Sequence, residues 1–226
     1  MRDETSLLAA LQHADSFFPS GAIAFSWGLE ALVADGQVTG AEGLGEFLET
    51  QLRQRWANFD RAFLVAAHRA GGDFERLASL DRLAEAMALP REAREAAQRL
   101  GQALLGVHER LATPGAADYR ALVKSGRAVG QLPVVQGLLF RAVGLDETAA
   151  SAVAGHSLVA MLASAAIRLG VASHVDAQRA IAATRPILAR IIQAPPPPPE
   201  RAFSFAPATD IAAMRHEIQT TRLFAN

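Results

Sequence analysis

The sequence contains no cysteine, which excludes disulfide bridges, thiolate nucleophiles, zinc ribbons and iron–sulfur clusters. Lysine is nearly absent as well, because Lys124 is the only one among 22 basic residues. It stands in the run Val123-Lys-Ser-Gly126, without the upstream glycine that a phosphate-binding loop requires. A nucleotide site of the Walker type is therefore excluded too.

The chain also lacks an excess of charge of either sign. Its 22 basic and 23 acidic residues give a formal net charge of −1. Proteins that bind nucleic acid neutralise phosphates with clustered basic side chains, so nucleic acid is not an expected partner. The N-terminal Met1–Ser6 leads directly into an amphipathic segment without a signal peptide, which predicts a cytoplasmic location.

One stretch, Thr148–Ile167, has no charged residue and is long enough to span a bilayer. Its composition is wrong for a membrane span, because alanine, serine and threonine outnumber the large apolar residues. Gly155 and His156 also lie inside it. We interpret the stretch as a buried helix of a protein with no membrane partner, and His156 as a hydrogen-bonded core residue.

Apolar residues recur at three- and four-residue steps nearly throughout the chain, which is the period of amphipathic helices. The clearest stripe, Leu44–Phe63, predicts one long helix that ends at Gly71. Thr39 and Ser173 are each followed three residues later by an acidic residue, which predicts two capping boxes. Pro186 should kink its helix or mark a boundary inside it. The fold class is therefore all-α, a single helical bundle of about eight to ten helices.

The only clear composition boundary is a run of five prolines, Pro195–Pro199. Polyproline forms a semi-rigid extended spacer. We therefore expect an all-α domain over residues 1–194, a linker over 195–199 and a C-terminal tail over 200–226.

No residue pattern for catalysis or metal binding is present in the sequence. No two histidines lie three or four positions apart, as two ligands on one helix would. His68 and His108 lie near helix ends, where a dipole interaction or solvent exposure accounts for them. A nucleophile elbow is also missing. We predict no metal site, no cofactor and no enzymatic activity.

Two segments have unusual composition for a helical bundle. Phe17–Glu30 places three phenylalanines and Trp27 around a Pro-Gly turn, although a hydrophobic loop folded into the core would account for the aromatics alone. In the tail, Ile211, Met214 and Ile218 share one helical face. Leu223 and Phe224 add an apolar end, which a frayed terminus would seldom carry, so the tail is predicted to order on a partner.

Both segments resemble signatures of the UreF family of urease accessory proteins. Residues 19–30 read PSGAIAFSWGLE and are similar to the pattern P-x-G-[AG]-[FY]-[ST]-[YF]-S-x-G-L-E. Residues 210–224 read DIAAMRHEIQTTRLF and are similar to D-I-A-x-M-x-H-E-T-Q-Y-S-R-L-F. Weaker similarities at 99–105, 132–137 and 168–178 keep the family order. The resemblance thus covers nearly the whole chain.

The chain departs from these patterns at several positions. Ile23 and Ala24 replace an aromatic and a hydroxyl residue, and Phe25 stands where tyrosine is common. In the tail, Ile218 and Thr220 replace threonine and tyrosine. The chain therefore resembles a divergent member of the family.

The resemblance implies a non-enzymatic part in nickel-enzyme assembly. Proteins of this family are all-α and form homodimers. They bind the accessory protein called UreD or UreH and with it recruit the GTPase UreG, and the complex loads nickel into apo-urease. On this hypothesis the partner-binding residues are Phe17, Pro19, Gly21, Phe25, Ser26, Trp27, Glu30, Met214, Arg215, His216, Glu217, Arg222, Leu223 and Phe224. Lys124, as the unique lysine, is assigned to the GTPase surface as a hypothesis.

Two other functions stay open at the level of the sequence. The first is a helical enzyme that binds a cofactor or small molecule with scattered histidines and glutamates. The second is a chaperone that binds nickel itself, for which His216 is the candidate residue.

Overall fold

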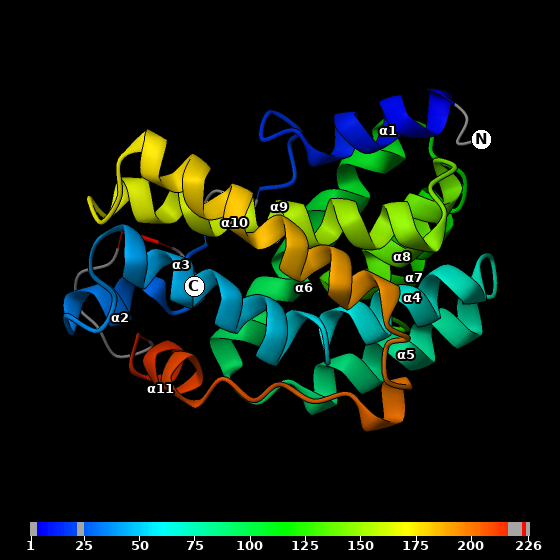
Figure 1. The fold of residues 1–226 in the computed structure, drawn as a ribbon. Coiled ribbons are helices and arrows are strands. Elements are labelled where there is room, and N and C mark those ends of the chain that lie inside the picture. The colour runs from blue at the N-terminus through cyan, green and yellow to red at the C-terminus, as the bar shows by residue number, and fades with distance from the viewer. Residues whose placement is uncertain (1–3, 22–24, 217–222, 225–226) are drawn as a thin grey trace.

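Residues 4–21, 25–216 and 223–224 are described by the computed structural model, which is a bundle of helices (Figure 1). Within these residues there are eleven α-helices and no strand, so the predicted all-α class is confirmed. The elements in chain order are α1 (Glu4–Ala14), α2 (Leu29–Ala34), α3 (Gly40–Thr50), the π-helix η2 (Gln51–Trp56), α4 (Asp60–Ala70), α5 (Phe74–Met87), α6 (Arg91–Arg110), α7 (Ala116–Lys124), α8 (Leu132–Ala142), α9 (Glu147–Arg168), α10 (His174–Gln193), the 3₁₀ turn η3 (Pro199–Arg201) and α11 (Pro207–His216). Ten of the described α-helices belong to the bundle, as predicted, and the eleventh lies in the tail beyond the prolines.

Helix α9 lies at the centre of the first apolar core. It packs against α1, α3, α8 and α10, and its small residues allow close approach. A Cβ atom added to Gly155 would lie 2.5 Å from Cδ1 of Leu188 on α10. By length and composition α9 is the one helix of the described residues that could cross a membrane, yet 56% of its most apolar window is buried. These contacts are those of a core helix.

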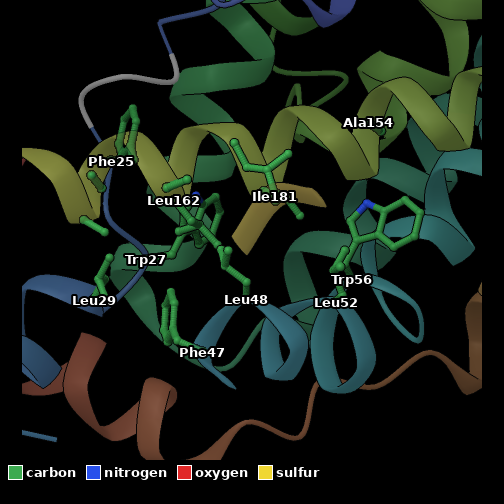
Figure 2. Close-up of a cluster of buried hydrophobic side chains, with 14 of the residues drawn as sticks. Phe25, Trp27, Leu29, Phe47, Leu48, Leu52, Trp56, Ala154, Leu162 and Ile181 are labelled. Atoms are coloured by element: carbon green, nitrogen blue, oxygen red, sulfur yellow. The ribbon is translucent and has the colours of Figure 1, made fainter. Parts of the chain in front are cut away.

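Aromatic side chains from distant segments contribute to this first core (Figure 2). Phe25 and Trp27 come from the segment before α2, whereas Trp56 comes from η2. They pack with aliphatic residues such as Leu48 of α3 and Leu162 of α9. The aromatic segment is thus partly folded into the core, as its composition alone would require.

The second apolar core lies among α4, α5, α6, α7 and α8. Its most extensive helix contact joins α4 and α8, where Gly137 faces the backbone of α4. A Cβ atom at this position would lie 2.3 Å from the carbonyl oxygen of Leu64, so only glycine allows the two helices to approach this closely.

Asp81 of α5 is a fully buried carboxylate that joins three elements of the second core. It accepts hydrogen bonds from the Tyr119 hydroxyl (2.8 Å) and from the backbone amides of Val129 (2.8 Å), Gly130 (2.6 Å) and Gln131 (2.7 Å). Burial raises the pKa of Asp81, while these hydrogen bonds act in the opposite direction. The three amides directly precede α8, so Asp81 fixes where that helix begins.

Several local predictions can be compared with the structure. The Ser173 capping box is confirmed, because its hydroxyl accepts from the Asp176 amide and the Asp176 carboxylate accepts from the Ser173 amide. The capping box at Thr39 is wrong, because that side chain makes no capping bond. The single helix predicted up to Gly71 is also wrong: it is divided into α3, η2 and α4, with a break between η2 and α4. Pro186 lies inside α10, which continues through it.

The proline linker and the tail fold back along the bundle. The Arg61 guanidinium donates to the carbonyl oxygens of Ile192 (2.9 Å) and Ala194 (2.8 Å) and so satisfies the end of α10. Beyond the prolines, the amides of Phe203 and Phe205 donate to carbonyls near the end of η2. Figure 1 shows this orange segment running along the lower side of the molecule to α11.

The histidines are placed differently from the sequence-based interpretation. His156 is exposed on α9, whereas His68 and His108 are buried. His108 stacks on His13 of α1 with ring centroids 5.2 Å apart, and its Nδ1 lies 2.9 Å from the Thr113 hydroxyl. His68 and His108 do lie in the last turns of α4 and α6, so only their expected solvent exposure is wrong, whereas the core position expected for His156 is wrong outright. The helical face that a histidine occupies depends on the partner helix, which a single spacing does not reveal.

We expect Asp81→Asn to destabilise the protein by about 3 kcal/mol, because one acceptor oxygen becomes an amide group that faces buried N–H donors. The measurement is urea unfolding followed by circular dichroism. The control is Asp118→Asn on the exposed surface of α7, which should change the free energy of unfolding little. Equal effects of the two substitutions would contradict the structural role of Asp81.

The buried imidazole of His108 should make stability depend on pH. Burial and the nearby His13 lower the pKa of His108 to about 4, against 6.5 for the free side chain. The unfolded chain therefore takes up a proton that the folded chain excludes, so stability is complete above about pH 6.5 and falls toward pH 4. Between about pH 7.5 and about pH 5 the loss should be about 2 kcal/mol.

His108→Gln should remove that part of the pH dependence, while His174→Gln, at an exposed position, should retain it. Urea unfolding at the two pH values measures both. A wild-type pH dependence in the His108 variant would show that another group is responsible.

Candidate functional site

The aromatic turn (residues 17–30) and the C-terminal tail (residues 200–226) meet on one side of the molecule. Helix α11 packs against α2, which begins at the end of the turn, and against α6. At the contact, Gly28 has φ +81°, and a Cβ atom there would lie 2.9 Å from the carbonyl oxygen of Thr209. The two segments that carry unusual composition are therefore in backbone contact.

Glu30 binds the end of the tail. One carboxylate oxygen accepts from the amide of Leu223 (2.6 Å) and the other from the amide of Phe224 (3.1 Å). The Phe224 ring is buried, and the Arg168 guanidinium lies 4.3 Å from the ring centroid. Two interactions therefore fix this end of the chain. The Glu30 carboxylate accepts two hydrogen bonds from backbone amides, and the Arg168 guanidinium lies over the Phe224 ring.

Two further contacts fix helix α11 itself. The two terminal N–H groups of Arg215 donate hydrogen bonds to the two Asp35 carboxylate oxygens, at 2.6 Å and 3.2 Å. On the buried side, the Gln51 amide donates to the Thr209 hydroxyl at 2.9 Å. The contact between α11 and the bundle thus combines an exposed ion pair with a buried hydrogen bond.

The predicted partner-binding residues lie at different depths. Phe25, Ser26, Trp27 and Phe224 are buried, and Glu30 is half-buried. The exposed residues are Phe17, Pro19, Gly21, Met214, Arg215 and Leu223. The side chains of His216, Glu217 and Arg222 lie outside the described residues, as does Ile218. Lys124 is exposed at the end of α7, which Figure 1 places far from α11.

The sequence did not indicate four residues of this site: Asp35, Gln51, Thr209 and Arg168. Each lies on a helix or at a helix end, where a polar residue is common and attracts no attention in the sequence. Their partners lie between 158 and 180 positions away for the first three, so no local pattern connects them. Only the weak similarity of the segment that begins at Arg168 could have drawn attention to one of them.

A cavity of about 550 Å³ lies beside the aromatic turn and is lined by the 13–21 segment, Trp27, η2, α6, α8 and α9. Most of its lining is apolar, with Asp60 and Arg55 among the polar groups. Burial raises the pKa of Asp60, and the Arg55 charge partly opposes that shift. In the described part of the chain, no group of three or more histidine, aspartate or glutamate side chains could hold a metal ion.

Glu30→Gln should release the end of the tail, because an amide group cannot accept two hydrogen bonds from the facing backbone amides in the way a carboxylate does. We expect hydrogen exchange at Leu223 and Phe224 to accelerate about tenfold, as loss of a charge-assisted hydrogen bond predicts. Mass spectrometry of C-terminal peptides measures this. Glu46→Gln, exposed on α3, is the control, and similar exchange in both variants would contradict the contact.

Comparison with known proteins shows the family to which the chain as a whole belongs. The sequence model of the UreF family matches residues 38–185. Similar relatives are the urease accessory proteins UreF of Trichodesmium erythraeum (34% identity over 99% of this chain and 98% of the relative) and of Rhizobium leguminosarum bv. viciae (33%, over 99% and 97%). UreF of Kocuria rhizophila is 34% identical over 96% of both chains. The chain therefore belongs to the UreF family of urease accessory proteins.

Proposed function

We propose that this protein is a non-enzymatic scaffold for nickel insertion into apo-urease. It binds a UreD- or UreH-type accessory protein, and the two together recruit and regulate a UreG-type GTPase. The family membership supports the general role, since the relatives carry the name urease accessory protein. The homodimeric state and the cytoplasmic location belong to the same proposal.

The single observation that carries the docking proposal is that the turn and the tail form one surface with apolar side chains left exposed. Ile211 and Met214 of α11 and Leu223 of the tail are each about half exposed (56%, 46% and 53%). Arg215 lies next to them and is also exposed. Exposed apolar residues beside an arginine are typical of the centre of a protein interface. We assign this surface to the UreD-type partner.

The GTPase would bind elsewhere on the molecule. Lys124 is exposed at the end of α7, and Figure 1 shows a wide lateral separation between α7 and α11. Two partners could therefore be bound at the same time without competing for one surface.

One observation favours a second candidate, a helical enzyme that binds a small molecule. The cavity of about 550 Å³ has the size of a small-molecule site and contains a carboxylate and a guanidinium. We rank it below the scaffold because family membership supports assembly, whereas the polar groups of the cavity form no recognisable pair of nucleophile and base.

The scaffold proposal is tested by co-purification of the full chain with UreD- and UreG-type proteins. Met214→Asp should reduce capture of the UreD-type protein at least about tenfold, because it places a charge in an apolar contact. Since the GTPase is recruited with that partner, its capture should fall as well. Lys124→Ala should reduce capture of the GTPase alone.

The control is Leu8→Asp, an apolar position on α1 that is even more exposed (64%) than Met214 (46%) and lies on the opposite side of the molecule from α11 in Figure 1. It should leave the UreD-type interaction intact. If Met214→Asp binds the UreD-type protein as well as the wild type does, the tail is not the docking surface. If neither protein is captured by the wild type, the scaffold proposal itself is wrong.

A further inference from the structure

Arg55 lies between the aromatic turn and the bundle. It belongs to the π-helix η2, and its side chain is only 13% exposed. The guanidinium lies 3.7 Å from the centroid of the Trp27 ring, and its Nε is 3.4 Å from the carboxylate of Asp60. A planar cation on an aromatic face is a favourable contact when it is withdrawn from water.

Trp27 is held in a backbone conformation that is costly for a residue with a side chain. Its φ is +53°, in the left-handed region, and it is not glycine. The side chain is 5% exposed, and within the described residues its Nε1 has no hydrogen-bond partner. Such a residue keeps its conformation only when the surrounding contacts fix it. The Arg55 guanidinium over the ring is one of these contacts.

Arg55 also faces the tail. Trp27, Arg55, Thr209, Asp210 and Ala213 line one small crevice together with the start of α6, and only about 10 Å³ of space remains there. Burial raises the pKa of Asp210, and the Arg55 charge partly opposes that rise. Arg55 therefore stabilises the charged form of Asp210 in α11, just as it stabilises that of Asp60 in α4.

We propose that Arg55 is a positioning residue that joins the aromatic turn and helix α11 into one docking surface. It stacks on the turn through Trp27 and attracts the tail through Asp210, but it is too buried to serve as the main contact for a partner. This inference rests on the proposed function only for its consequence, which is binding of a UreD-type protein. The coupling between turn and tail is a property of the isolated chain.

The test compares Arg55→Gln with Arg53→Gln in the full-length protein. Arg53 lies two residues away on η2, is 43% exposed and pairs with Glu49 of the same helical stretch, so it is a matched control. Arg55→Gln should accelerate hydrogen exchange of α11 amides about tenfold, leave α8 unchanged and weaken UreD-type binding about tenfold. Arg53→Gln should change none of these.

Two further variants separate the stacking from the charge. Arg55→Lys should keep much of the protection of α11, because an ammonium group still attracts Asp210, but it should alter tryptophan emission because the planar group over Trp27 is lost. The chain has only two tryptophans, so this signal is readily detected. Asp210→Asn should loosen α11 without altering that emission, and it serves as the second test if Arg55→Gln does not fold.

The possible outcomes are distinct. Unchanged exchange in α11 with both Arg55→Gln and Asp210→Asn would overturn the inference, and Asp210→Asn alone decides it if the arginine variant is unfolded. Faster exchange with normal UreD-type binding would support the positioning role of Arg55 and overturn the assignment of the docking surface. Faster exchange with weakened binding would support both.

Discussion

The buried carboxylate of Asp81 is the polar contact on which the arrangement of the bundle depends. The backbone amides just before a helix have no partner in that helix, and here three of them donate to one side chain of α5. Because α8 packs against α4 and α6, fixing its start positions both of these helices. Helix α6 in turn carries part of the contact with α11. The contact between the aromatic turn and the tail thus depends indirectly on the hydrogen-bonded carboxylate of Asp81 in the second core.

The tail adds its own contacts to this scaffold. Glu30 binds its last described amides, Arg215 pairs with Asp35, and the buried Gln51 and Thr209 fix the inner side of α11. These bonds make a surface with contributions from both ends of the chain. Such a surface needs less ordering when a partner binds than a free segment does, and this lowers the entropic cost of association.

Much of the secondary structure could be predicted from spacing, because a 3.6-residue period and a capping residue are local properties. The Ser173 capping box and the buried character of α9 followed in this way. The break between η2 and α4 could not be predicted, because the apolar stripe continues through it. The positions of His68, His108 and His156 were also out of reach, since burial depends on which helix lies opposite.

The sequence by itself determined the fold class, the absence of cysteine chemistry and the two segments that resemble signatures of the UreF family. These depend on composition, on local period and on residues that are adjacent in the chain. Only the tertiary structure decided that the two segments meet. Glu30 and Leu223 are 193 positions apart, and Arg55 of the π-helix faces both segments. Hydrogen bonds and ion pairs act over a few ångströms in space, so separation along the chain carries no information about them.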